Sequence, residues 1–260
     1  MVARIETDKQ GHTGFIVFDH QARRNAMTSE MWRAVPAIVD AFARDTDVRV
    51  VVMRGAGEVA FVAGADISEF ERVRSGDVAE DYDADNRRAF AALSGLEKPL
   101  VAMVHGFCIG GGCALALTAD LRYSADDGRF GIPAARLGLG YQMAGIETLM
   151  HAVGLSNAKE LFFRAGRFSA EEALRMGLLN GVFPKADLEA SVLAIAEEIG
   201  QNAPLTIRAA KIATQEILRP AAKRDRSRVD AAIRACYASA DYKEGVAAFL
   251  GKRRARFQGQ

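Results

Sequence analysis

Residues 106–114 read Gly-Phe-Cys-Ile-Gly-Gly-Gly-Cys-Ala, and this segment decides the fold of the chain. It follows an apolar run, residues 100–104, which begins directly after Pro99 and is typical of a buried strand. It leads into a run of small residues that continues to Ala119 and indicates a helix. The segment therefore predicts a strand, a glycine-rich turn and a helix in immediate succession.

The three successive glycines at 110–112 allow the backbone to approach a ligand closely, because no side chain stands in the way. At the start of a helix the first N–H groups have no partner within the helix, and they carry the positive end of the helix dipole. An anionic oxygen fits there, whether it belongs to a phosphate or to an enolate. A nucleotide site is not indicated, because the chain has no GxxxxGKS or GxxxxGKT motif.

A second small-residue turn, Phe-Val-Ala-Gly-Ala-Asp-Ile at residues 61–67, comes after another apolar run at 48–54. The order of strand, glycine-rich turn and helix thus recurs, although at uneven spacing and without a repeat of fixed period. Further strands are expected at residues 4–7, 14–19, 121–124 and 129–132, and helices at 28–43 and 86–96. Ser169 and Glu172 form a capping-box pair, and Gly177 is expected to close the helix that this pair opens.

The last part of the chain has helical periodicity in four segments, residues 187–200, 204–218, 226–240 and 242–250. We therefore predict an α/β fold with a strand-rich core over residues 1–195 and a helical module over residues 196–260.

Composition excludes several classes of protein. The 34 Lys and Arg residues nearly balance the 33 Asp and Glu residues, so charge gives no reason to expect nucleic acid or membrane partners. Cys108, Cys113 and Cys236 are too few and too irregularly spaced for a disulfide framework or a zinc site. We find no signal peptide and no apolar run near the ~18 residues of a membrane span. A cytoplasmic protein without a bound metal is expected.

With these features in place, the sequence resembles the enoyl-CoA hydratase/isomerase (crotonase) superfamily over essentially its whole length. The matching segments occur in the family's order and spacing, at residues 63–66, 98–102, 110–113, 120, 130–133, 173–178 and 248–253. The resemblance implies a spiral of short ββα turns followed by C-terminal helices that build trimers and often hexamers. It implies an acyl-CoA substrate, a homotrimer or hexamer, and no cofactor apart from the coenzyme A of the substrate.

The resemblance also assigns site residues. The backbone N–H groups of Ala65 and Gly111 are implied to form an oxyanion hole for the enolate of the thioester, which is electrostatic stabilisation by fixed donors. Residues of this chain that match coenzyme A contacts are Arg23, Arg24, Ala26, Ala63, Asp66 and Ile67. Phe249 and Lys252 match residues that reach the coenzyme of a neighbouring subunit.

Proton transfer is where the sequence departs from the family. Hydratases of this family use two glutamates, and their positions fall on Ala114 and Ala134, neither of which can move a proton. A third acid position, used by dienoyl isomerases and aromatic dehalogenases, falls on Gln142. The segment around Tyr141 is similar to the methylmalonyl-CoA decarboxylase branch, which has a tyrosine there but a histidine where this chain has Ala65.

Three hypotheses follow: an acyl-CoA enzyme of the family with altered chemistry, a decarboxylase in which Tyr141 lies near the departing carboxylate, and a silent acyl-CoA-binding protein. The charged residues nearest in sequence, Glu69, Arg136 and Glu147, are weaker catalytic candidates, because each residue type is more often found in surface ion pairs.

Overall fold

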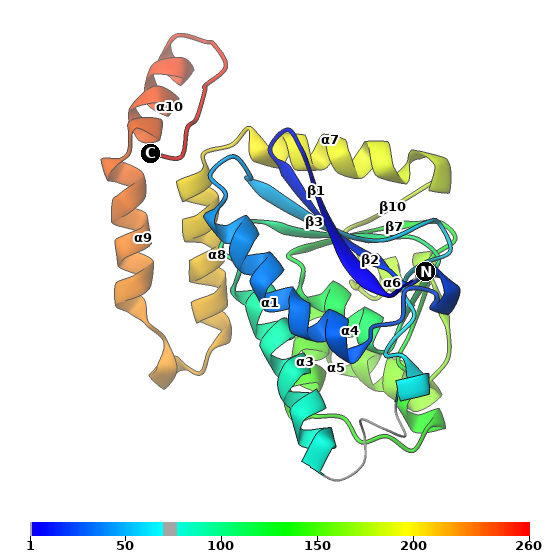
Figure 1. Ribbon diagram of the computed structural model, residues 1–260. Helices are drawn as coiled ribbons and strands as arrows, with labels where there is room; N and C mark the ends of the chain where they lie inside the picture. Colours follow the sequence, from blue (N-terminus) through cyan, green and yellow to red (C-terminus); the bar gives the residue numbers. More distant parts are fainter. Residues whose placement is uncertain (1, 70–76) are drawn as a thin grey trace.

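A computed structural model describes residues 2–69 and 77–260, and it has two β-sheets covered by helices (Figure 1). The larger sheet has the strand order β1-β2-β3-β5-β7-β10. Its first pair is antiparallel and every other neighbouring pair is parallel. The strands span Arg4–Gln10, Thr13–Asp19, Val50–Gly55, Leu100–Val104, Leu121–Ala125 and Gly181–Phe183.

The smaller sheet has the order β4-β6-β8-β9, with the first three strands parallel and the last pair antiparallel. Its strands span Ala60–Val62, Phe107–Ile109, Arg129–Gly131 and Phe168–Ser169. Along the chain, β3 is followed by β4, β5 by β6, and β7 by β8, so each turn of the chain gives one strand to each sheet. The expected spiral of ββα turns is confirmed.

Helices follow these strand pairs and cover the sheets. They span Ser29–Arg44 (α1), Asp77–Gly95 (α3), Gly111–Thr118 (α4), Met143–Arg164 (α5), Ala170–Arg175 (α6) and Leu188–Gly200 (α7). Thr28 caps α1 by accepting a hydrogen bond from the N–H of Met31 at 3.2 Å, and Pro36 lies within the continuous helix. The Ser169–Glu172 capping box is present at the start of α6, as predicted. No described helix is long and apolar enough to cross a membrane.

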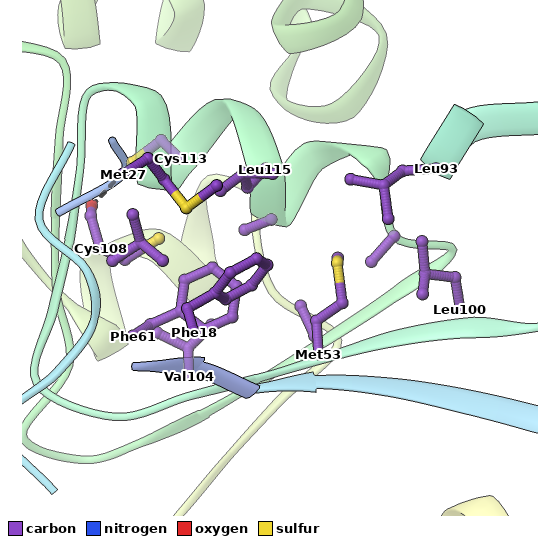
Figure 2. Packing of buried hydrophobic residues seen from close by; sticks show 14 of the residues in the cluster. Phe18, Met27, Met53, Phe61, Leu93, Leu100, Val104, Cys108, Cys113 and Leu115 are labelled. Atoms are coloured by element: carbon purple, nitrogen blue, oxygen red, sulfur yellow. Dashed lines mark hydrogen bonds between the residues drawn. The ribbon is translucent and has the colours of Figure 1, made fainter. Parts of the chain in front are cut away.

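The strands β3 and β5 are buried on both faces. Val51 and Met53 of β3 belong to the main core, whereas Val50 and Val52 belong to a second core under α7. This alternation is the period of two that a strand imposes on its side chains, and a parallel sheet covered on both faces needs apolar residues on each. In the main core, Phe18 packs edge to face on Phe61 with ring centroids 5.8 Å apart. Figure 2 shows both rings beneath α4.

Three expectations from the sequence need correction. The helix expected from residue 86 begins at Asp77. Its start was missed because the polar first half of the helix has little apolar periodicity, although Tyr82 and Asp85 in this half are buried. The short strands β4, β6, β9 and β10 were not predicted. Residue 195, where we expected the core to end, lies inside α7, whose apolar face packs on the larger sheet. We therefore draw the division after Gly200.

The C-terminal helices extend away from the body of the molecule (Figure 1). They span Pro204–Leu218 (α8), Arg226–Ala238 (α9) and Ala240–Leu250 (α10). An ion pair with a buried cation ties α8 to the core: the ammonium of Lys211 donates to Oδ2 of the more exposed Asp120 at 2.6 Å. The same carboxylate accepts from the N–H of Leu100 at the start of β5, at 2.7 Å. Burial lowers the pKa of Lys211, and the charge of Asp120 opposes that shift.

Replacement of Asp120 by Ala should destabilise the protein by about 3 kcal/mol, because it leaves the buried ammonium of Lys211 without its counter-charge. Lys211→Met keeps the side-chain stem and leaves a carboxylate that water can reach, so its cost should be about 1 kcal/mol. Urea unfolding followed by circular dichroism measures both. Equal losses in the two variants would contradict a role for charge burial.

Candidate functional site

The start of α4 lies directly against β4. A Cβ atom added to Gly112 would be 1.9 Å from the carbonyl oxygen of Val62, so only glycine permits this approach. Gly110, the N-cap of α4, has φ +55°, and its N–H donates to the carbonyl oxygen of Gly131 at 2.8 Å. The glycine-rich turn is thus tied to both β4 and β8, and the helix begins at a fixed position.

This approach brings the two predicted amides together. A Cβ added to Gly111 would be 3.7 Å from the backbone nitrogen of Ala65, and both residues are partly exposed. Within the described part of the chain, neither N–H donates a backbone hydrogen bond. Two such donors beside the positive end of a helix dipole are groups to which an anionic oxygen can bind.

The position of Ala65 is set by a bridge to the chain before α1. The N–H of Met27 donates to the carbonyl oxygen of Gly64, and the N–H of Asp66 donates to that of Met27, each at 2.9 Å. These bonds use the groups on either side of Ala65 and leave its own N–H directed elsewhere. The N–H of Ala63 donates to the carbonyl oxygen of Arg24 at 3.0 Å. The structure therefore brings together residues 24–27 and 63–66.

The side chain of Asn25 ties the segment 24–27 to the chain at the start of β4, and this role was not predicted. It is buried with φ +58°, and its Nδ2 donates to the carbonyl oxygens of Ala56 and Ala60, at 3.0 and 2.8 Å. Its Oδ1 accepts from the N–H of His20 at 3.0 Å. Asparagine tolerates the left-handed conformation, which is the one signal in the sequence that could have drawn attention to it.

Asp66 is buried beside Ala65 and orients its loop. Its Oδ1 accepts from the N–H and the hydroxyl of Ser68 at 3.0 and 2.7 Å. Burial raises the pKa of this carboxyl, but the hydrogen bonds from Ser68 and the electrostatic interactions with His20 and Arg23 outweigh that effect and hold the pKa below its ordinary value. Asp66 is therefore a carboxylate at neutral pH and does not store a proton.

Several arginine side chains lie near these loops. Arg23 and Arg24 are exposed, and the guanidinium of Arg24 lies over the ring of Phe107, 4.6 Å from its centroid. The guanidinium of Arg167, which the sequence did not single out, lies 5.4 Å from the same ring. The guanidinium groups of Arg24 and Arg167 thus both contact the same aromatic side chain of β6. Ala26 is buried, and the side chain of Ile67 lies outside what the structure describes.

The residues at the expected proton-transfer positions are placed on three different elements. Ala114 lies partly exposed in the first turn of α4, and Ala134 is buried in the 3-10 turn Pro133–Arg136. Tyr141 is half-buried before α5 and packs edge to face on Phe162, with centroids 4.9 Å apart. Gln142 is exposed and is the N-cap residue of α5.

The weaker catalytic candidates have other surroundings. The carboxylate of Glu69 accepts hydrogen bonds from the N–H and hydroxyl of Ser29, at 2.8 and 3.0 Å, at the start of α1. Arg136 and Glu147 are exposed. Phe249 and Lys252 are exposed at the far end of the α8–α10 arm, away from α4 (Figure 1), so the chain does not bring them to its own Ala65 and Gly111. Among the described residues, no group of three His, Cys, Asp or Glu side chains could hold a metal ion.

The chain is similar to known proteins in both sequence and structure. A family profile described as enoyl-CoA hydratase/isomerase matches residues 9–260. The chain is 32% identical over 247 residues to the short-chain-enoyl-CoA hydratase of Clostridium acetobutylicum, covering 95% of this chain and 94% of the relative. It is 33% identical over 253 residues to the crotonyl-CoA hydratase of Syntrophomonas wolfei, covering 97% of each. An enoyl-CoA hydratase/carnithine racemase from Magnetospirillum magneticum has a similar structure, with a TM-score of 0.94 at 30% identity, covering 98% of this chain and 96% of that one.

Replacement by alanine should change the free energy of unfolding to different extents at Gly112, Gly111 and Gly95. Gly112→Ala should lose at least about 3 kcal/mol of unfolding free energy, because the backbone carbonyl of Val62 cannot yield to the new Cβ. Gly111→Ala meets only ordinary contacts, so its change should stay within about 1 kcal/mol. Gly95→Ala, which meets nothing within 4 Å, is the matched control. Urea unfolding of the three variants measures the difference, and a stable Gly112→Ala protein would contradict the close approach of α4.

Proposed function

Because the chain belongs to the enoyl-CoA hydratase/isomerase family, we propose that it converts acyl-CoA thioesters and stabilises the thioester enolate between the N–H groups of Ala65 and Gly111. The observation that carries this proposal is the closeness of these two unpaired amides at the start of α4. The negative charge of an enolate oxygen grows during the reaction. Donors that are already in position stabilise that charge without having to reorganise.

The coenzyme is proposed to bind along the joined loops. Arg23 and Arg24 would face its phosphates, with Arg167 as an added cation, while Ala26, Ala63 and Asp66 would line the path to the thioester. Ile67 is assigned to the same path by the family resemblance alone. Phe249 and Lys252 would serve the coenzyme of a neighbouring subunit in a homotrimer or hexamer, since they lie far from the site of their own chain.

The acyl group is proposed to be short and α,β-unsaturated. The relatives from Clostridium acetobutylicum and Syntrophomonas wolfei are described as short-chain-enoyl-CoA and crotonyl-CoA hydratases, so crotonyl-CoA is the first substrate to test. With Ala114 and Ala134 at the positions where the family places glutamates, the site has little means of moving protons. We therefore expect hydration well below the rate of a relative that has both acids.

The proposal is tested by incubating the purified protein with crotonyl-CoA, methylmalonyl-CoA and ethylmalonyl-CoA, and following the product masses. Gly111→Ala should reduce turnover of whichever substrate reacts by about 100-fold, because its methyl group occupies the space in front of the amide of Ala65. Loss of CO₂ that disappears in Tyr141→Phe would identify a decarboxylase instead. Binding without turnover of any of these substrates would identify a silent binding protein.

The role of the missing acids is tested by restoring them. The double replacement Ala114→Glu with Ala134→Glu should raise crotonyl-CoA hydration by about 100-fold, which is within the usual contribution of general acid–base groups. Hydration is measured by the loss of the conjugated enoyl absorbance. Ala114→Gln with Ala134→Gln, which adds side chains of the same size without an acid, is the matched control. Rapid hydration by the unmodified protein would show that other groups transfer the protons.

A further inference from the structure

The segment that carries the amide of Ala65 is joined to the chain at the start of α1 at two points. At the first point, the N–H of Met27 donates to the carbonyl oxygen of Gly64 and the N–H of Asp66 donates to that of Met27, each at 2.9 Å. Met27 is 1% exposed, and its side chain belongs to the same core cluster as Cys113 of α4 (Figure 2). This junction is made of backbone groups, and the core holds it in place.

The second point depends on one side chain. Oε2 of Glu69 accepts hydrogen bonds from the N–H and the hydroxyl of Ser29, at 2.8 and 3.0 Å, and both residues are partly buried. Ser29 is the first residue of α1. An N–H at this position has no partner within its helix, and the positive end of the helix dipole favours a carboxylate. Glu69 therefore anchors the far end of the Ala65 segment to a helix that is packed on the core.

A short turn connects the two points. It is the 3-10 turn Ile67–Glu69, in which the N–H of Glu69 donates to the carbonyl oxygen of Asp66 at 3.1 Å. Oδ1 of Asp66 accepts from the N–H and the hydroxyl of Ser68, at 3.0 and 2.7 Å, so hydrogen bonds to both the backbone and the side chain of Asp66 stiffen the turn. A displacement of Glu69 therefore moves Asp66 with it.

The N–H of Ala65 lies on the opposite side of its peptide group from the bond to Met27. The carbonyl oxygen of Gly64 and the N–H of Ala65 belong to one planar trans peptide group and point in opposite directions. With the oxygen held at Met27, a tilt of this group about that bond would swing the N–H. The bond between Glu69 and Ser29 prevents such a tilt, because two junctions fix a segment that one junction would leave free to rotate.

We propose that Glu69 is a positioning residue, which keeps the N–H of Ala65 aligned with that of Gly111 through its bond to Ser29. This role rests on the proposed function, because it presupposes that the two amides stabilise an enolate. It requires an acceptor oxygen at residue 69 and no proton, so an amide oxygen could fill it. A general acid or base at the same residue would require a group that ionises. A single substitution, Glu69→Gln, therefore separates the two roles.

The first test measures turnover of whichever of crotonyl-CoA, methylmalonyl-CoA and ethylmalonyl-CoA reacts. Glu69→Ala should lower kcat about tenfold with KM within about twofold of wild type, because a displaced donor weakens stabilisation of the transition state more than it weakens binding. Glu69→Gln keeps an acceptor oxygen, so its kcat should lie within about threefold of wild type with an unchanged pH profile. Glu30→Ala removes an exposed carboxylate from the same first turn of α1, and this matched control should react like wild type.

The second test needs no turnover. It compares 3-oxobutyryl-CoA, which forms an enolate in mildly alkaline buffer, with butyryl-CoA, which does not. In calorimetric titrations, Glu69→Ala should weaken the binding of 3-oxobutyryl-CoA about fivefold and that of butyryl-CoA by less than about twofold, since only the enolate places a full charge at the two amides. Ser29→Ala should cause part of this loss and no further loss in the Glu69→Ala background, because the two side chains make one interaction. Thermal unfolding checks that each variant is folded.

Each outcome decides the role of Glu69. If Glu69→Ala reacts and binds like wild type, the positioning role is overturned while the proposed function stands. Equal losses of turnover in Glu69→Gln and Glu69→Ala would identify an acid–base group, and equal weakening of both ligands would show a general structural role; either result overturns positioning. If the wild-type protein binds the ligands but converts no substrate, the titrations decide alone. If it binds neither ligand, the proposed function fails and the role of Glu69 fails with it.

Discussion

The contact between Gly112 and the carbonyl oxygen of Val62 constrains the rest of the structure. It brings the first turn of α4 against β4 with no room for a side chain. From the opposite side the same helix is fixed by Cys113 and Leu115, which are buried above Phe18 and Phe61 (Figure 2). Because α4 is held on both sides, the amide of Gly111 is placed by the core of the molecule, and its position does not depend on a flexible loop.

The same constraint explains why the site is made of backbone groups. Backbone N–H groups cannot change rotamer, so two of them held by β4 and α4 keep their geometry as long as the core is intact. Around them, the bridge between Met27 and Ala65 and the side chain of Asn25 fix the second amide. The stabilisation of an enolate that we propose would thus be a property of the fold, whereas proton transfer would depend on side chains at positions such as 114, 134 and 141.

Much of this fold could be predicted from the sequence, because long apolar runs and helix caps are local signals. The strands β3 and β5, the caps at Thr28 and Ser169, and the glycine turn were found in this way. Strands of two or three residues, such as β4 and β6, contain too few positions to show a period, and their partners are distant in the chain. The start of α3 was missed for a related reason: its polar first half has too little apolar periodicity to indicate a helix.

The candidate site shows the same difference between residues with a signal in the sequence and residues defined by distant contacts. The pairing of Ala65 with Gly111 was predicted from the family resemblance, and the three glycines at 110–112 had a direct meaning for the backbone as well. Asn25 and Arg167 could not be predicted, since each makes its contacts with a neighbour that is distant in sequence: Ala60 and Phe107, respectively. The side chain of Asn25 could be interpreted only once the structure showed the carbonyl groups of Ala56 and Ala60 to which it donates.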